Sequence, residues 1–256
     1  MPAGSDDGSA RVYGREPLRG AVDDPGALEI ERIRQEYARR AREIPAGFYD
    51  SNRSENQFLH AGAARACARL LREEGAFPLN RAQILDVGCG QGHWLLEFLM
   101  WGATVSRLHG IDLLPERIVQ ARERLAGAEL LSGDARTLPW PDSSFDLAAQ
   151  FTVFSSILDA TVRQQIAREM LRVLRPGGRI LWYDMRRSNP ARPVRGIGRK
   201  EIRQLFPGCR FRFENATLAP PLARLVAPHS WAAAFALESL PFAKTHLAAV
   251  ITRGGN

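Results

Sequence analysis

Three closely spaced glycines and a later acid are the residues whose types and spacing point most directly to chemistry. The glycines are Gly88, Gly90 and Gly92, and the acid, Asp112, follows about twenty residues on. Glycines carry no Cβ, so this loop can bring backbone close to a ligand, and a helix beginning at His93 would direct free N–H groups at an anion such as a carboxylate. An acid at the end of the next apolar segment is placed to accept hydrogen bonds from both hydroxyls of a ribose. Together these features predict a nucleotide-type pocket.

The glycine spacing argues against a dinucleotide ligand. A dinucleotide fingerprint needs G-x-G-x-x-G, but here the third glycine comes one residue early and His93 stands where that fingerprint requires glycine. A pyrophosphate is therefore not the expected ligand of this loop.

Alternating apolar segments must position these residues. Such an alternation of strands and helices predicts a parallel sheet with helices on both faces, whose ligands bind at the carboxyl ends of the strands. Gly88, Asp112, Asp134 and Phe151 all fall at such ends. The predicted elements are strands near 82–87, 107–111, 128–132, 145–150 and 178–184, and helices near 92–101, 115–126 and 161–174.

Further elements flank this core. An amphipathic helix with the apolar stripe Ile30, Ile33 and Tyr37 is expected over 28–44. The apolar segment 216–243 has three interpretations: a lid, an interfacial helix resting on lipid, or ordinary packing against the sheet. The other flanking elements are a helix over 57–74, a basic, proline-rich irregular segment over 185–198, a short helix over 199–206, and strands over 210–215 and 246–252.

The order of these pieces resembles the class I S-adenosylmethionine-dependent methyltransferases, and within them the small-molecule family described as type 11. The resemblance extends over roughly residues 82 to 185 and rests on three further motifs, Ser132-Gly133-Asp134-Ala135, Leu138 to Asp146, and Leu171 to Leu181 with its Pro-Gly-Gly turn. It implies an α/β, Rossmann-like, doubly wound and mostly parallel seven-stranded sheet with N-terminal helices and a C-terminal lid-like insertion.

The sequence also predicts a division of the chain. Residues 1–25 mix Gly, Ser, Asp and Pro without apolar periodicity and are expected to be a mobile N-terminal arm, and residues 26–80 are expected to form a helical cap. Residues 81–256 would form the methyltransferase domain, with 185–245 as its acceptor-side or lid region.

The resemblance implies S-adenosyl-L-methionine as cofactor and S-adenosyl-L-homocysteine as product. The glycine loop would hold the methionine part, and Asp134 would meet the adenine amine. Asp86 has two interpretations, since it could hold the N–H groups of the loop or lie near the amino group of the cofactor. The expected cofactor-binding residues are Asp86, Gly88, Gly90, Gly92, Asp112, Leu113, Asp134, Ala135, Phe151 and Tyr49.

Methyl transfer from a sulfonium needs the nucleophile, methyl carbon and sulfur in line, so holding two reactants in register supplies much of the acceleration. A hydroxyl acceptor loses a proton, and a base within hydrogen-bond reach would help. Asp184 and His229 are the candidate catalytic residues. The structural alternatives are a salt bridge from Asp184 to Arg186 or Arg187, and a hydrogen-bonded structural role for His229.

Positive charge is concentrated in one part of the chain. The formal net charge is +7, and between Arg163 and Arg212 fourteen basic residues stand against three acids. An anionic partner fits this pattern, whether nucleic acid, a phosphorylated or nucleotide-linked substrate, or an acidic membrane surface. The simpler alternative is a solvated arginine-rich surface.

The cysteine content and the hydropathy of the sequence bear on metal binding, cellular setting and membrane association. Cys67, Cys89 and Cys209 match no zinc or redox spacing, so no metal site is expected and a reduced, cytoplasmic setting fits. We expect no secretory signal and no transmembrane segment, and peripheral contact is the expected kind of membrane association. Oligomeric state is not fixed by these features.

The sequence thus predicts a methyltransferase acting on a small-molecule acceptor, with direct transfer to an oxygen of a sugar or secondary metabolite, as in natural product biosynthesis. One alternative is an RNA methyltransferase that uses the arginine-rich 163–212 region. The sequence lacks the Asn-Pro-Pro-Tyr or Asp-Pro-Pro-Tyr motif that would indicate methylation of an exocyclic base nitrogen. The other alternative is a cofactor-binding protein without turnover.

Overall fold

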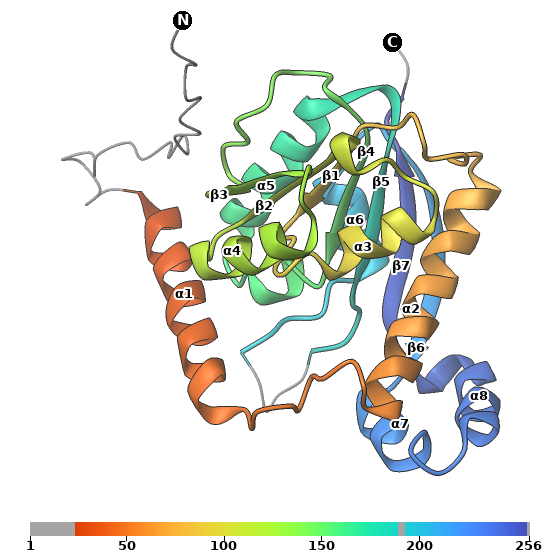
Figure 1. Ribbon diagram of the computed structural model, residues 1–256. Coiled ribbons are helices and arrows are strands. Elements are labelled where there is room, and N and C mark those ends of the chain that lie inside the picture. The colour runs from red at the N-terminus through yellow and green to blue at the C-terminus, as the bar shows by residue number, and fades with distance from the viewer. Residues whose placement is uncertain (1–23, 189–192, 255–256) are drawn as a thin grey trace, which may run out of the picture.

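A seven-stranded sheet forms the centre of the computed structural model, which describes residues 24–188 and 193–254 (Figure 1). The strand order is β3-β2-β1-β4-β5-β7-β6. Neighbouring strands from β3 to β5 are parallel, whereas β7 is antiparallel to both β5 and β6. Residues 1–23 of the predicted arm lie outside the described residues. The strands are β1 (Ile84–Val87), β2 (Leu108–Asp112), β3 (Glu129–Ser132), β4 (Phe145–Phe151), β5 (Leu174–Met185), β6 (Arg210–Leu218) and β7 (Lys244–Thr252).

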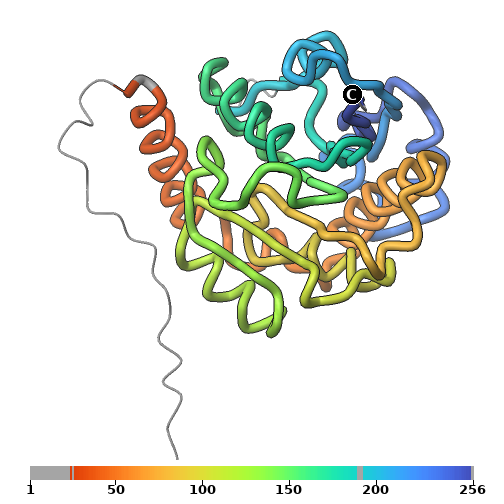
Figure 2. The backbone as a smooth tube through the Cα atoms, turned by 90° about the horizontal axis from the view of Figure 1, so that it is seen from above, coloured from red at the N-terminus to blue at the C-terminus, as the bar shows by residue number. Residues whose placement is uncertain are grey.

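Helices cover both faces of this sheet. Viewed from above, α5 and α6 lie on one face and α2, α3 and α4 on the other (Figure 2). α1 lies beside α4, at the end of the sheet nearest β3 (Figure 1). The α-helices are α1 (Pro25–Glu43), α2 (Ser54–Glu73), α3 (His93–Met100), α4 (Pro115–Arg124), α5 (Ala160–Val173), α6 (Arg199–Leu205), α7 (Pro220–Val226) and α8 (Trp231–Ser239), and the short 3-10 turns are η1 (Val105–Arg107), η2 (Phe154–Ser156) and η3 (Pro241–Ala243).

The apolar character of β1 follows from this layering. Successive side chains of a strand point to opposite faces, so Leu85 and Val87 join the core beneath α5 while Ile84 joins the core beneath α2 and α3. All four β1 residues are buried. A strand covered on both faces must be apolar almost throughout, which makes Asp86 an exception that needs a reason.

Two elements differ from their predicted form. β5 begins at Leu174, because that residue pairs with Phe145 before a register shift brings Arg179 opposite Leu147. The predicted Pro-Gly-Gly turn therefore lies within the assigned strand. In the apolar 216–243 segment, α7 and α8 pack against α2, where Trp231 Nε1 donates to Ser54 Oγ at 2.8 Å and the Trp231 ring meets Phe58 edge to face.

The parallel strands bring their carboxyl ends to one edge of the sheet. Gly88 follows β1, Asp112 ends β2, Asp134 follows β3 and Phe151 ends β4. β1 lies between β2 and β4, so the chain reverses its winding direction at β1, which is where ligands of such sheets bind.

Among the helices of residues 24–188 and 193–254, none combines the length and apolar character that crossing a bilayer requires.

Candidate functional site

The glycine loop leaves β1 in a backbone conformation that only glycine adopts easily. Gly88, Gly90 and Gly92 have φ angles of 76°, 54° and 82°. The N–H groups of Gly88 and Cys89 both donate to the Ile111 carbonyl, at 2.8 and 3.0 Å, and so fasten the loop to the end of β2. A Cβ on Gly88 would lie 2.4 Å from Val153 Cγ2, so the loop passes too close to the next strand's exit for any side chain.

Asp112 clamps this loop from the neighbouring strand. Its Oδ2 accepts a hydrogen bond from the Gly90 N–H at 2.8 Å, and its Oδ1 accepts one from the Leu114 N–H at 3.0 Å. Each carboxylate oxygen has a second lone pair, so these bonds leave acceptor capacity for a ligand hydroxyl. The acid therefore sets the shape of the glycine loop and also presents charge to the space beside it.

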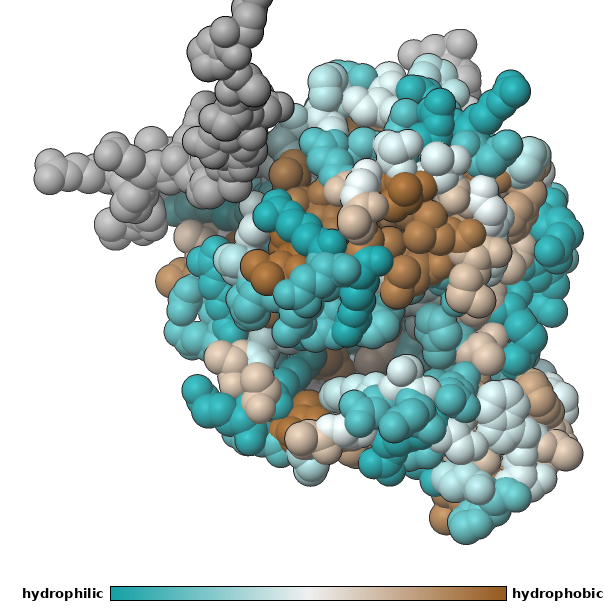
Figure 3. All heavy atoms as spheres, viewed as in Figure 1, coloured by the Kyte–Doolittle hydropathy of each residue, from teal (hydrophilic) through white to brown (hydrophobic). Residues whose placement is uncertain are grey.

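That space is a cavity of about 160 Å³ at the carboxyl edge of the sheet. Six of the predicted cofactor-binding residues line it, namely Gly88, Asp112, Leu113, Asp134, Ala135 and Phe151. The surface on this side of the molecule is hollowed beneath α3 and α4 (Figure 3). The structure thus gathers residues from the exits of four separate strands around one cavity.

Other predicted residues lie outside the lining. Gly90 and Gly92 have the loop's other two positive φ angles, and Gly92 is the N-cap of α3. Tyr49 is 57% exposed in the connection between α1 and α2, where its ring meets Phe48 edge to face at 4.9 Å. His229 is exposed in the connection between α7 and α8. The cofactor contact predicted for Tyr49 and the catalytic role predicted for His229 stay predictions.

Several residues of the cavity were not assigned to it from the sequence. The apolar stripe of α1 faces the cavity, as expected of a covering helix, and the Arg117 guanidinium lies over the Tyr37 ring at 4.3 Å from its centroid. Nothing in the sequence marks Arg117, because its place depends on α1 packing beside α4. Among the lining residues outside the predicted site are Ile30, Ile33, Arg117, Val153, Ser156 and Ile157.

Two side chains on one turn of α1 hold this helix over the cavity. The Glu29 carboxylate is buried and accepts hydrogen bonds from the Leu158 and Asp159 N–H groups. Arg32 pairs with Glu29 and donates to the Ser156 carbonyl at 2.7 Å. Burial opposes ionisation of Glu29, but Arg32 and the Leu158 N–H outweigh it and lower the pKa of the carboxyl.

Replacing Glu29 by glutamine is expected to loosen α1 from the cavity. Glutamine keeps one acceptor oxygen but loses the charge that pairs with Arg32, which should cost about 1 to 2 kcal/mol. We expect cofactor affinity to fall about threefold to tenfold, with faster protease cleavage within residues 25–43. Glu31→Gln, on the exposed side of the same helix, is the control. Equal affinity and cleavage rates in Glu29→Gln and the control would show that α1 is held otherwise.

The structure excludes one of the two interpretations of Asp86. Its carboxylate is buried, and in the described part of the chain neither oxygen has a hydrogen-bond partner, so it does not hold the N–H groups of the loop. Asp112 does so instead. Burial, and secondarily the nearby Asp112 charge, raise the pKa of Asp86 well above its ordinary value. An orphaned acid beneath a ligand loop fits a cationic group arriving with the ligand, such as an ammonium.

Asp184 is bonded to backbone and does not line the cavity. Its Oδ2 accepts from the Ser155 N–H at 3.1 Å and its Oδ1 from the Met185 N–H at 2.7 Å. The alternative salt bridges to Arg186 and Arg187 are not formed in the described part of the chain. Complete burial raises the pKa of Asp184 to about 6, although its hydrogen bonds with Ser155 act in the other direction. The contact holds η2, whose residue Ser156 lines the cavity, against the end of β5.

The raised pKa of Asp184 predicts a pH-dependent stability. The unfolded carboxyl ionises near pH 4 and the folded one near 6, so its contribution is fully present below pH 4 and is lost as the pH rises to 6. From pH 5 to 7.5 this loss should be about 1 to 2 kcal/mol. Asp184→Asn should lack it, so denaturant unfolding of variant and wild type should differ by that amount between the two pH values. Asp142→Asn, at an exposed carboxylate, is the control, and parallel profiles for wild type and Asp184→Asn would contradict the assignment.

Comparison with known proteins agrees with this geometry. Residues 84–178 match the family model described as a methyltransferase domain. A malonyl-[acyl-carrier protein] O-methyltransferase of Erwinia pyrifoliae is 37% identical over 144 residues, which cover 54% of this chain and 50% of that protein. A demethylmenaquinone methyltransferase of Deinococcus radiodurans is 37% identical over 131 residues, covering 49% and 52%. The chain thus spans about half the length of the curated relatives it matches.

A solved structure extends the likeness of the fold. It is the complex between the Haloferax volcanii Trm112 methyltransferase activator and a putative methyltransferase, which is 20% identical with a TM-score of 0.59, covering 88% of this chain and 98% of that one. At this identity the likeness concerns the fold alone. Residues 84–178 therefore match a methyltransferase domain, and the chain shares the fold of that solved structure.

Proposed function

We propose that this protein is an S-adenosylmethionine-dependent methyltransferase that transfers the methyl group directly to an oxygen of a small-molecule acceptor, such as a sugar or a secondary metabolite. The observation that carries this proposal is the meeting, at one cavity, of the Gly88 turn, the Asp112 clamp and Asp134. The name of the Erwinia relative, an O-methyltransferase, supports oxygen as the accepting atom.

The residues present fit this cofactor. The orphaned Asp86 carboxylate would balance the ammonium of a methionine moiety, and the Gly88 turn would admit its carboxylate end to the backbone. Asp112 would take the ribose hydroxyls and Asp134 the adenine amine. When bound, the cofactor supplies a methyl group on a positively charged sulfur.

The described part of the chain would contribute to methyl transfer mainly by positioning the two reactants. The ionisable residues that line the cavity are Tyr37, Asp112, Arg117 and Asp134, and Asp134 is paired with Arg136 at 2.8 Å. Asp184 and His229 are absent from the lining. We therefore propose that alignment of acceptor and methyl group within a water-poor cavity, closed on one side by α1, is the larger part of the acceleration.

We further propose that residues 26–80 act as a cap on the cofactor and that residues 185–245 form the acceptor side. α1 supports the first part, since Ile30, Ile33 and Tyr37 line the cavity. The position of residues 186–188 directly after β5, at the edge that carries the cavity, supports the second. A cytoplasmic setting remains part of this proposal.

Calorimetric titration with S-adenosylmethionine and S-adenosylhomocysteine, followed by transfer of a labelled methyl group to a panel of hydroxyl and carboxyl acceptors, tests the function. We expect both nucleosides to bind with one-to-one stoichiometry and transfer to at least one acceptor. Absence of heat and of protection against thermal unfolding would refute the proposal. Binding without transfer to any acceptor would favour the cofactor-binding protein without turnover.

A further inference from the structure

The connection between β5 and α6 is unusually basic. Residues 186–200, which we call the arginine strap, contain five arginines and one lysine but no aspartate or glutamate. Like charges brought together without acids repel one another, so such a segment is stabilised when an anion joins it.

The arginine strap is held in a defined shape in its described part. The Ile197 N–H donates to the Met185 carbonyl at 2.8 Å, and the Gly196 N–H donates to Ser188 Oγ at 3.1 Å. A Cβ on Gly196 would lie 2.5 to 2.6 Å from backbone atoms of Arg187, so the two arms of the strap are in direct contact there. This packing fixes the backbone that carries Arg187 and, two residues after Ile197, the backbone of Arg199.

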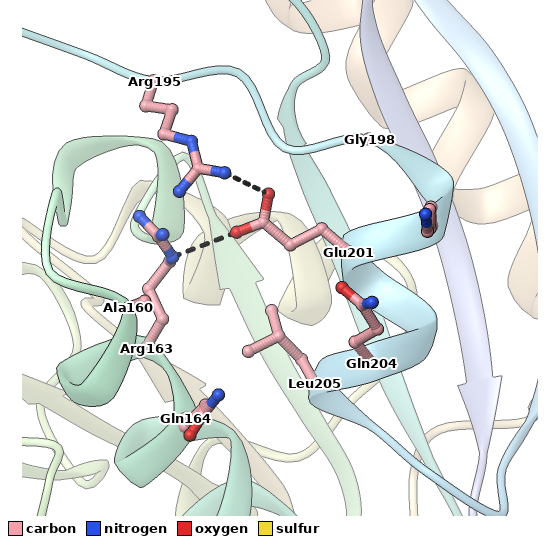
Figure 4. Close-up of a pocket in the computed structure, with 9 residues that line it drawn as sticks. Ala160, Arg163, Gln164, Arg195, Gly198, Glu201, Gln204 and Leu205 are labelled. Carbon is pink, nitrogen blue, oxygen red and sulfur yellow. Dashed lines mark hydrogen bonds and ion pairs between the residues drawn. The ribbon is translucent and has the colours of Figure 1, made fainter.

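One acid outside the strap neutralises only part of this charge. Glu201 of α6 pairs with Arg195 at 3.1 Å and with the buried Arg163 of α5 at 3.2 Å (Figure 4). Both carboxylate oxygens of Glu201 are thereby engaged on the side of the strap that faces α5. The negative charge of Glu201 is therefore paired with these two arginines and holds the arginine strap against α5 and α6.

On the other side of the strap, three arginines line a hollow of about 460 Å³ together with Asn215 and Leu247. Arg186 donates from Nε to the Lys244 carbonyl and Arg199 from Nη2 to Asn215 Oδ1. In the described ranges of the chain, neither these two nor Arg187 pairs with a carboxylate. Burial lowers the pKa of Arg186, and the positive charges of Arg187 and Arg199 lower it further, as expected of cations that no acid neutralises.

The arginine strap also adjoins the wall of the cofactor cavity. The Arg195 N–H donates to the Ser155 carbonyl at 2.9 Å, and Ser155 precedes Ser156, which lines the cavity. Asp184, one residue from the end of β5, binds the Ser155 N–H. The strap therefore begins and is anchored beside the edge at which a methyl acceptor must approach.

We propose that the hollow bounded by Arg186, Arg187 and Arg199 binds a phosphate group of the methyl acceptor, so that the substrate class is phosphorylated small molecules. The proposal rests on the function proposed above. Guanidinium groups match phosphate geometry through paired hydrogen bonds, and three of them around one hollow favour an oxyanion of more than one charge over a neutral hydroxyl compound.

Titration of the whole protein with inorganic pyrophosphate, at fixed ionic strength, tests this site. Arg187→Gln and Arg199→Gln should each weaken pyrophosphate binding about tenfold, and the double variant more strongly. S-Adenosylmethionine affinity should stay unchanged in all three. The control is Arg81→Gln, which removes an exposed arginine just before β1, at the opposite edge of the sheet, and should leave pyrophosphate binding intact.

Three results would overturn the inference. The first is no measurable pyrophosphate binding, and the second is equal weakening by Arg81→Gln, which would indicate general charge attraction. The third is strap-dependent binding of single-stranded RNA or of phosphatidylglycerol vesicles without binding of pyrophosphate, which would assign the arginines to a polymer or a membrane. Failure of S-adenosylmethionine to bind wild type would instead refute the proposed function, and the pyrophosphate titration separates the two failures.

Discussion

Replacing Gly88 by alanine is expected to weaken S-adenosylmethionine binding roughly 30-fold or more. An alanine at a φ of 76° is strained by about 1 to 2 kcal/mol, and its Cβ would lie 2.4 Å from Val153 Cγ2. Overpacking of this kind costs about 1 to 3 kcal/mol more. The loop or Val153 must move to relieve it, and both line the cavity. Calorimetric titration of the purified variant measures the loss.

Two further variants separate the clash from general strain. Gly75→Ala places alanine at a similar φ of 66° with nothing within 4 Å of the new Cβ, so it should reduce stability without changing cofactor affinity. Adding Val153→Ala to Gly88→Ala should restore part of the affinity, because it removes the clashing methyl. If Gly88→Ala binds as tightly as wild type, the glycine turn does not hold the cofactor.

Replacing Asp112 by alanine should weaken cofactor binding about tenfold to a hundredfold. The lost bond from a ribose hydroxyl to this charged acceptor is worth about 1.5 to 3 kcal/mol, which sets the expected range. The change also removes the hydrogen bonds from the Gly90 and Leu114 N–H groups, which are present before a ligand binds. Asp142→Ala, at an exposed carboxylate, should bind the cofactor normally.

A ligand change can isolate the ribose contact within this effect. Wild type should bind 2′-deoxy-S-adenosylhomocysteine more weakly than S-adenosylhomocysteine, because one hydroxyl that Asp112 would accept from is missing. In Asp112→Ala the two ligands should bind alike, since the shared partner is gone. An undiminished difference between the ligands in the variant would limit Asp112 to shaping the glycine loop.

The sequence predicted the part of the site that is built from neighbouring residues. The buried run ending at Gly88 and the acid ending β2 are set by local pattern, because strand periodicity and glycine conformations act over a few residues. The fold class followed from the alternation of strands and helices and is confirmed by the seven-stranded sheet.

The remainder depends on contacts between distant residues. The contact of Glu29 with Leu158 spans 129 residues, and no local pattern could indicate it. The sequence also could not indicate that Asp112, and not Asp86, accepts the hydrogen bond from the Gly90 N–H. That partner depends on the register of β1 against β2, in which Asp86 stands opposite Gly110. For the same reason, none of the three interpretations of residues 216–243 named α2 as the element against which α7 and α8 pack.

β7 lies between β5 and β6 in the sheet, although it follows both of them along the chain. During synthesis the ribosome therefore releases β5 with an open edge, and β6 has no neighbouring strand to join until β7 has emerged. The open edge of β5 is a template for pairing with other chains, and it stays open until β7 pairs with β5. The interval between the emergence of β5 and that of β7 is thus the stage at which the unpaired edge of β5 is exposed to other chains.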